Sequence, residues 1–459
     1  MKYLIHSLVV LSFTGCATRP EPSQLQKINL PAAWTAAATN EGTPQAWLDG
    51  FKDPQLEALV AEALANNAEF ERATAALGQS IAEARITGAD IKPSANLGLG
   101  GARQKISTFG PNNTGGVIFE NYDLNLNLSW ELDLWGRLRD LDAAALARVE
   151  ASEAELAAAR LSLAAQVTKA WFNLIEANQQ VAEAERTATS YRKNLETLES
   201  RFKRGLTDGL DLRRIRTAAA ASQADLATRE RGLNAAKLNL EIVLGRYPDA
   251  SVVTESILPE LPEPIPTGLP AELIQRRPDL IAAERQLAAA DKDVRAKQKD
   301  LLPNISLTAS GGTSTREFED LLDNDFTVWS LAGNLAQPIF QGGRIRANID
   351  RSASIADQAR AAYRNAALQA FLEVETTLAA ESYLKNEYTH LAIAAEEATA
   401  AEQLAWERYR SGTTDFLEVL DAQRTAAGSR GRFINAGNLL LQNRIDLYLA
   451  LGGPFETEI

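Results

Sequence analysis

The chain has 459 residues, of which 60 are acidic and 47 are basic, so its formal charge is −13 at pH 7. This excess of carboxylates argues against nucleic acid as a partner, because phosphate backbones are bound by clustered Lys and Arg side chains. The only histidines are His6 and His390, and the only cysteine is Cys16. Zinc sites, cysteine nucleophiles and Ser-His-Asp triads all draw on these residue types. We therefore expect no enzyme activity, no metal site and no cofactor.

Residues 1–15 begin with a basic Lys2 and continue as a short apolar stretch, which predicts a secretory signal peptide. The stretch is too short to cross a bilayer as a helix. The following segment, Phe13-Thr14-Gly15-Cys16, resembles a bacterial lipobox, although Phe13 stands where Leu is usual. This resemblance implies that Cys16 carries lipid and becomes the mature N-terminus, and Ala17 after it implies sorting to the outer membrane. The alternative is an ordinary signal peptide followed by an incidental cysteine.

The chain is one unit repeated twice. Residues 201–212 (RFKRGLTDGLDL) match residues 408–419 (RYRSGTTDFLEV) at an offset of 408 − 201 = 207. Residues 91–100 (IKPSANLGLG) match residues 301–310 (LLPNISLTAS) at an offset of 301 − 91 = 210. A proline-rich stretch, residues 258–270, separates the halves and predicts an extended connector, since repeated proline disfavours both helix and central strand.

Each half is predicted to contain a helix, two strands, a very long helix, a tight turn and a shorter helix. The long helix of the first half runs from about Arg137 to Arg201 without proline, which corresponds to about 97 Å. Its apolar residues recur in steps of three and four, the pattern of a coiled coil. They are Leu163, Val167, Ala170, Leu174, Ala177, Val181, Ala184, Ala188, Tyr191, Leu195, Leu198 and Phe202. The helices alone do not exclude an isolated coiled coil or bundle.

The shorter helix of the second half has two adjacent apolar rows and is predicted to contact two neighbouring helices. One row is Val419, Ala426, Phe433, Leu440 and Leu447, and the other is Leu420, Ala427, Ile434, Leu441 and Tyr448.

Residues 122–134 alternate strictly between apolar and polar side chains, the period-two pattern of a membrane barrel strand with one face in lipid and the other in water. Shorter versions occur at 94–103, 304–313 and 326–336, and the intervening segments Ile106–Asn121 and Arg316–Asp325 are predicted to be loops. Trp130, Trp135 and Trp329 are either an interfacial belt or anchors for packing.

Four strands cannot close a barrel, and open sheet edges are not tolerated in hydrocarbon. Several copies of the chain must therefore share one barrel. Two, three or four copies would supply 8, 12 or 16 strands, and the strand pattern does not choose among them.

Six segments together resemble the TolC-like outer-membrane efflux duct family, in its OprM/NodT-type lipoprotein branch. They are residues 46–67, 132–139, 268–291, 301–312, 337–347 and 412–424. The resemblance covers nearly the whole mature chain. It implies an α+β membrane protein that forms a homotrimer, with a 12-stranded β-barrel continued by a long α-helical coiled-coil barrel in the periplasm. It also implies a periplasmic adaptor and an inner-membrane transporter of the resistance-nodulation-division type as partners.

The predicted organisation has six parts. They are a signal peptide at 1–15, a lipidated extended segment at 16–55, the first repeat at 56–245, a proline-rich connector at 246–270, the second repeat at 271–452 and a C-terminal tail at 453–459.

The resemblance places a periplasmic gate at the two helical turns, residues 204–211 and 411–421. Asp421 matches the acidic ring residue of the family gate, Glu418 a second acidic position, and Tyr409 a tyrosine of the gate network. Arg213 and Arg214, on the matching helix of the first half, are candidate partners for these carboxylates. Thr414 departs from relatives that have an arginine there. The alternative is that Glu418 and Asp421 simply form a solvated helix face.

The sequence therefore predicts a passive exit duct for a drug, metal-ion or solvent pump, held in the outer membrane of a Gram-negative bacterium. Two alternatives stay open, which are a duct for type I protein secretion and a structural coiled-coil lipoprotein. The sequence does not specify the substrate, the individual transporter and adaptor, the ion selectivity, or whether the resting channel is open.

Overall fold

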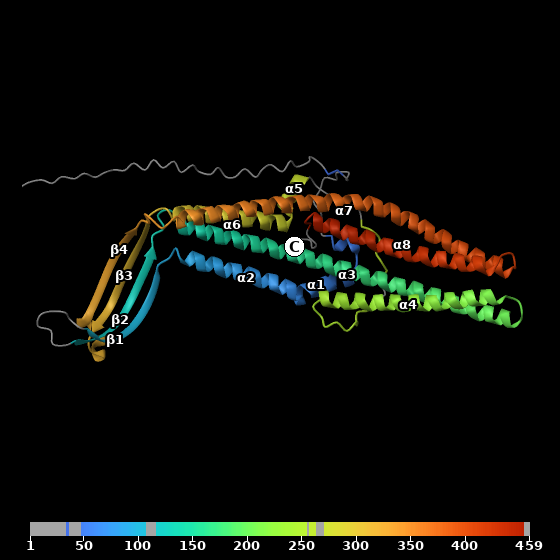
Figure 1. The fold of residues 1–459 in the computed structure, drawn as a ribbon, viewed down its shortest axis with the longest axis horizontal. Coiled ribbons are helices and arrows are strands. Elements are labelled where there is room, and N and C mark those ends of the chain that lie inside the picture. Colours follow the sequence, from blue (N-terminus) through green and yellow to red (C-terminus); the bar gives the residue numbers. More distant parts are fainter. Residues whose placement is uncertain (1–33, 36–46, 107–115, 255–256, 263–269, 454–459) are drawn as a thin grey trace, which may run out of the picture.

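The computed structural model describes residues 34–35, 47–106, 116–254, 257–262 and 270–453. The molecule is elongated, with a sheet at one end and two helical hairpin turns at the other (Figure 1). The first half contains α1 (Pro54–Asn66), α2 (Ala68–Ala89), β1 (Ser94–Ile106), β2 (Val117–Glu131), α3 (Arg137–Lys203) and α4 (Gly209–Val243). The second half contains α5 (Pro270–Arg276), α6 (Pro278–Lys299), β3 (Asn304–Thr315), β4 (Thr327–Ala336), α7 (Arg344–Arg410) and α8 (Phe416–Ala450). Three short 3-10 helices lie at Asp49–Phe51, Phe318–Leu322 and Asn324–Phe326.

The two halves repeat each other closely. Helices α3 and α7 both have 67 residues, and α4 and α8 both have 35. The strands are preceded in each half by two helices, where the sequence predicted one. Asn67 separates α1 from α2 by capping α2, and Pro278, which has no N–H to donate, starts α6 after α5. The predicted duplication of helix, strand pair, long helix and shorter helix is thus confirmed with one added helix per half.

The strands form one antiparallel sheet in the order β1-β2-β3-β4. Its register places Leu97 opposite Leu126, Leu126 opposite Gly311, and Gly311 opposite Trp329, so these residues share one face. Leu97 is 73% exposed and Trp329 is 79% exposed on that face of the single chain. The other face is polar, with Asn96, Asn127, Ser310 and Ser330 in one cross-strand row. A sheet with one exposed apolar face and one polar face matches the predicted barrel wall.

Strand boundaries differ from the prediction in every strand. β1 and β3 extend to Ile106 and Thr315 rather than 103 and 313, and β4 begins at Thr327 rather than 326. β2 begins at Val117, ahead of the predicted Tyr122, because Val117 and Ile118 pair with Ile106 and Lys105 and lengthen the first hairpin. β2 also ends at Glu131, short of the predicted residue 134, because the chain turns there and Leu134 N bonds Leu132 O at 2.9 Å. In the second loop, two 3-10 helices replace the predicted irregular segment.

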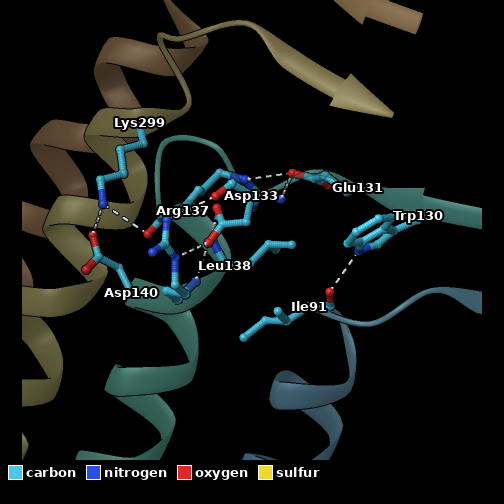
Figure 2. Close-up of polar contacts among 10 residues, drawn as sticks. Ile91, Trp130, Glu131, Asp133, Arg137, Leu138, Asp140 and Lys299 are labelled. Carbon is cyan, nitrogen blue, oxygen red and sulfur yellow. Dashed lines mark hydrogen bonds and ion pairs between the residues drawn. The ribbon is translucent and has the colours of Figure 1, made fainter. Parts of the chain in front are cut away.

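The turn from sheet to long helix is fixed by polar contacts (Figure 2). Trp130 Nε1 donates to Ile91 O at 2.9 Å, and Arg137 pairs with Glu131 at 2.7 Å. Asp133 accepts from the backbone N–H of Leu138 at 3.0 Å and so caps the start of α3. Lys299 from α6 binds Asp140 at 2.6 Å.

Two of the three tryptophans are therefore anchors for packing. Trp130 holds the end of β2 to the end of α2, and Trp135 Nε1 donates to Pro303 O at 2.7 Å. Trp329 lies on the exposed apolar face of the sheet, where an interfacial role fits. Gly136 and Gly343, with φ of 76° and 84°, precede α3 and α7 at the predicted sharp changes of direction.

Helix α3 is the centre of the helical part, and it contacts α2, α4, α6 and α8. Most of the predicted coiled-coil row is buried, including Leu163, Val167 and Leu174, whereas Phe202 near the turn is exposed. Helix α8 packs against both α3 and α7, which confirms that its broad apolar face meets two neighbours. Among the described helices, none combines the length and apolarity needed to cross a bilayer.

Candidate functional site at the helical tip

Two hairpin turns lie together at the end of the molecule that is remote from the sheet (Figure 1). Each turn has a glycine with positive φ, Gly205 at 73° and Gly412 at 75°. Each following helix has an aspartate cap, because Asp208 accepts from Asp211 N at 2.8 Å and Asp415 accepts from Glu418 N at 3.1 Å. The repeat thus builds the same turn twice at one end.

An apolar cluster under the turns, here called the tip cluster, joins the four helices. Its buried members are Tyr191 and Leu198 from α3, Leu212 and Ile215 from α4, Ala405 and Tyr409 from α7, and Phe416 and Val419 from α8. Because every helix contributes, one hairpin cannot leave the other without exposing apolar side chains to water.

The predicted gate residue Tyr409 is one of the two tyrosines of the tip cluster. Its ring lies 5.4 Å from that of Phe416, and the Arg201 guanidinium lies 5.1 Å from its centroid. Burial raises the pKa of the Tyr409 hydroxyl, while Arg201 and a hydrogen bond with Thr207 act in the opposite direction. Tyr409 therefore connects α7 to the end of α3 and to the turn after it.

The predicted acidic residues lie on the surface of the tip. The Asp421 side chain is 63% exposed and pairs with Arg424 of its own helix at 2.6 Å. Glu418 is exposed on the first turn of α8.

The predicted arginine partners lie at the same end. Arg214 pairs with Asp211 of its own helix at 3.5 Å, and Arg213 is exposed. A further ion pair at this end joins α4 to α3 within the first hairpin, where Arg216 binds Glu199 at 2.8 Å. These three ion pairs therefore lie within one hairpin or the other and do not link the two. Cys16, the predicted lipid site, lies outside the described residues.

Farther from the tip, polar contacts that the sequence analysis did not predict link α3 to α8. Gln423 Nε2 donates to Ser190 Oγ at 2.7 Å, and Arg430 Nε binds Glu183 at 2.6 Å. Gln442 Nε2 donates to Lys169 O at 3.0 Å. We call this set the α3–α8 polar contacts.

Arg430 is the central member because it also contacts α7. Its Nη1 binds Glu402 at 3.1 Å. Its Nε binds Glu183, which is 5% exposed and also pairs with Arg186. The sequence contains a pattern from which these polar contacts could have been predicted. Gln423, Arg430 and Arg444 recur every seven or fourteen residues between the apolar rows of α8, and such polar positions in a coiled coil commonly form specific buried contacts.

The two hairpins contact each other through the tip cluster and the α3–α8 polar contacts. Within the described ranges, no group of three or more His, Cys, Asp or Glu side chains is placed to hold a metal ion. Polar contacts between two packed helices can be exchanged for water at little net cost, since a typical internal hydrogen bond contributes only about 1 kcal/mol. The α3–α8 interface is therefore easier to separate than an all-apolar one.

The chain is similar throughout to known outer-membrane proteins. A model of the family described as "Outer membrane efflux protein" matches residues 59–246 and 269–453. OprJ of Pseudomonas aeruginosa is 33% identical over 98% of this chain and 95% of its own. The toluene efflux pump outer membrane protein TtgF of Pseudomonas putida is 32% identical over 90% of this chain and 86% of its own.

A solved structure of the outer-membrane channel OprN superposes with a TM-score of 0.86 at 29% identity, covering 93% of this chain and 97% of that one. This likeness confirms the predicted fold class, in which a small sheet continues into long paired helices. The chain belongs to the outer membrane efflux protein family and is an outer-membrane efflux channel.

Proposed function

We propose that three copies of the chain form the exit duct of a tripartite efflux system. The duct passively conducts small molecules or ions from an inner-membrane transporter of the resistance-nodulation-division type, through a periplasmic adaptor, to the outside. No catalytic step and no cofactor take part, and the only covalent addition is lipid on Cys16.

The observation that carries this proposal is the combination of a two-faced sheet with two 67-residue helices in one chain. The sheet has two open edges, β1 and β4, which require partner strands in a bilayer. Three copies would supply 12 strands, the number implied by the resemblance to TolC-like ducts. Each long helix extends about 100 Å, enough to carry a passage from the membrane deep into the periplasm.

The tip is the proposed gate. In a trimer with its axis along the long helices, three copies of Asp421 and Glu418 lie around the narrow end and hold the resting channel nearly closed. Tyr409 and the tip cluster hold each α7–α8 hairpin in this position. Arg213 and Arg214 are placed to meet carboxylates of a neighbouring copy, since within one chain the partner of Asp421 is Arg424.

Opening would require the α7–α8 hairpin to move away from α3. The α3–α8 polar contacts must then separate, whereas Arg430 and Glu402 move together because both belong to that hairpin. An adaptor or transporter that binds the open arrangement more tightly than the closed one would supply the necessary free energy. Exposed Leu206 and Leu210 at the turns offer apolar surface for such a partner.

The proposal is tested with purified protein reconstituted into liposomes that contain a small fluorescent dye. We expect the dye to leave liposomes that carry folded trimer with Asp421→Ala at the tip, to leave more slowly through the resting wild-type trimer, and to stay in liposomes that carry heat-denatured protein. Folded, membrane-inserted trimer that retains the dye in both resting and tip-mutated forms would contradict a conducting duct and favour the structural lipoprotein.

A further inference from the structure

A cavity of about 980 Å³ lies between α3 and the α7–α8 hairpin, and we call it the connector cavity. Its wall includes Ala182 of α3, Tyr388 of α7, Phe433 of α8 and residues 257–261 of the proline-rich connector. Sites for small molecules have volumes in this range and are lined mostly by apolar and aromatic side chains, with a few polar groups that orient the ligand. The connector cavity therefore has the dimensions of a ligand site.

The connector is held to the helices on both sides of the cavity. Asn178 Nδ2 of α3 donates to Thr254 O at 3.2 Å, and Arg444 Nη1 of α8 donates to Pro262 O at 2.8 Å. Between these two bonds, Leu258 is half-buried and packs against the main apolar core. The connector thus passes from α3 to α8 and forms one wall of the cavity.

Gly437 of α8 leaves room at the centre of the cavity. A Cβ atom at this position would lie 3.4 Å from Tyr388 Cε2 and 3.7 Å from Leu258 Cδ1. At the corresponding position of α4, 437 − 207 = 230, the chain has Glu230. A side chain longer than that of alanine at position 437 would have to displace the tyrosine or the leucine, so glycine keeps this part of the cavity open.

Most of the cavity wall is apolar and aromatic. Tyr388 stacks on Phe433 with ring centroids 4.9 Å apart and ring planes 30° apart, and both side chains are half-buried. Leu440 and Leu441 are buried beside them on α8. Aromatic rings pack against one another at such distances, and their faces attract cations. This wall suits a ligand that contains aromatic rings.

Three charged side chains line the cavity, and they are Glu183, Arg186 and Glu260. Glu183 is bound by both Arg186 and Arg430, so its charge is already balanced. Glu260 is exposed on the connector and forms no ion pair with any residue that the structure describes. With two carboxylates against one guanidinium, the lining has an excess of negative charge, and the carboxylate of Glu260 is the group that a ligand can meet.

We propose that the connector cavity is a binding site for a lipophilic cation, which is an apolar and largely aromatic molecule with a positive charge. Its rings pack against Tyr388 and Phe433, and its charge lies near Glu260. An anion of the same shape would be repelled by the same carboxylate.

The ligand also holds the α7–α8 hairpin against α3, and this part of the inference rests on the function proposed above. A molecule in the cavity contacts Ala182 on one side and Tyr388 and Phe433 on the other, and these surfaces separate in the proposed opening. The ligand therefore binds the closed arrangement more tightly, and this difference in affinity shifts the equilibrium. At one hundred times its Kd, a ligand that binds only closed channels lowers the ratio of open to closed channels about a hundredfold.

Two probes of matched shape test the binding site. Tetraphenylphosphonium and tetraphenylborate both carry four phenyl rings on one central atom, but the first is a cation and the second an anion. Their binding to the full-length protein in detergent is measured by equilibrium dialysis, with protein-free micelles as the control for partition into detergent. We expect saturable binding of the phosphonium and much weaker binding of the borate.

Substitutions locate the bound phosphonium. Glu260→Gln should weaken its binding at least about fivefold, since the attraction of one charge pair in contact has this size even in water. Glu185→Gln makes the same change of charge at an exposed α3 residue outside the cavity lining and should leave the affinity unchanged. Ala182→Trp places an indole ring in the cavity and should abolish saturable binding, whereas Ala182→Ser should retain it.

Three results would overturn the site. They are equal affinity for the two probes, equal effects of Glu260→Gln and Glu185→Gln, and wild-type affinity in folded Ala182→Trp. Circular dichroism and native mass show whether each variant is folded and assembled. If Ala182→Trp fails to assemble, the probe pair and the two glutamate variants still decide the outcome.

Single-channel recording tests the effect on opening. Added tetraphenylphosphonium should lower the open probability of wild type and of Ala182→Ser but not of Ala182→Trp, and all three proteins keep the tip carboxylates, so block at the tip is the same in each. Equal inhibition of wild type and Ala182→Trp would overturn the proposed hold on the hairpin. A protein that binds the phosphonium in this cavity but conducts no current would contradict the proposed duct while supporting the binding site.

Discussion

Glu241 shows how backbone N–H groups can stabilise a buried carboxylate. It lies near the end of α4 and accepts hydrogen bonds from the backbone N–H groups of Asp249, Ala250, Ser251 and Val252, at 2.7 to 3.2 Å. Burial acts to raise the pKa of Glu241, but these four donors outweigh it and hold the pKa below its usual value. The carboxylate thus organises the chain where it leaves the first repeat.

We predict that Glu241→Gln lowers the thermal midpoint of helix unfolding in detergent by several degrees at neutral pH, because the neutral amide makes weaker bonds and points a donor at other donors. The lowered pKa of Glu241 also determines how this stabilisation depends on pH. The stabilisation is present above the unfolded-state pKa of about 4.3 and is lost as pH falls through the lower folded-state pKa. The difference between wild type and Glu241→Gln, measured by circular dichroism, should therefore shrink under acid. An equal difference at all pH values would contradict this account.

Cys16 is the residue on which anchoring is proposed to depend. Each buried methylene of an acyl chain contributes about 0.8 kcal/mol, so several chains hold a protein firmly at a membrane. We predict that Cys16→Ser abolishes labelling by radioactive fatty acid and leaves part of the protein in the membrane fraction through its strands. Unlabelled wild-type protein would contradict the lipobox interpretation.

At the scale of elements, the alternating strand pattern is the part of the sequence that predicts the structure most directly. Leu126 and Asn127 are neighbours on β2 but lie on opposite faces of the sheet, as a period of two requires. We predict that Leu126→Arg destabilises the inserted protein by about 2 to 4 kcal/mol per chain if that side chain lies near the middle of the bilayer. Asn127→Arg, which places the same charge on the polar face, is the matched control and should assemble normally. Equal yields of folded oligomer from both variants would contradict the assigned faces.

The α3–α8 polar contacts allow a second prediction about an element. Arg430 binds Glu183 on α3 and Glu402 on α7, so only the first bond links the α7–α8 hairpin to the rest of the chain. We predict that Glu183→Gln increases the open probability of single channels, whereas Glu402→Gln, which makes the same change of charge within the hairpin, does not. Equal effects of the two substitutions on opening would show that the contact with α3 does not restrain the hairpin.

The sequence predicted regular elements well because their periodicity is local. The long helices, the alternating strands and the glycines before α3 and α7 all follow from patterns within a few turns of chain. The end of β2 was misplaced because Leu132 and Leu134 continue the alternation after the strand has turned, where the polar contacts of Asp133 decide the geometry. The pairing of Glu183 with Arg430 was missed because these residues are 247 positions apart and neither lies in an apolar row.

For the gate residues, the sequence predicts the position in the fold but not the contacts. Resemblance placed Tyr409, Glu418 and Asp421 at one end of the molecule, and the fold brings both turns together there. Within one chain, however, Asp421 and Arg214 have partners on their own helices. The closing contacts proposed above lie between neighbouring copies, and a single sequence contains no periodic pattern that specifies such pairs.

At the scale of the whole molecule, the duplication explains how one chain can supply a third of a closed wall. The β1–β2 and β3–β4 hairpins have equivalent registers, and together they leave β1 and β4 as the open edges of the sheet. In one copy, α6 and α8 lie between α3 and α7, and both hairpin turns lie at the end remote from the sheet (Figure 1). A passive channel closed only at that end is the central claim.

Single-channel conductance in planar bilayers tests this claim most directly, comparing wild type, Asp421→Ala, and Glu418→Ala with Asp421→Ala. Crowded carboxylates attract cations and hold the narrow end together through their partners. We predict small, cation-blocked conductance for wild-type trimers, larger conductance with weaker block by divalent cations in both variants, and unchanged trimer yield. Identical conductance and cation block in all three proteins would contradict a gate at these carboxylates, and the absence of any conductance from assembled trimers would contradict the channel itself.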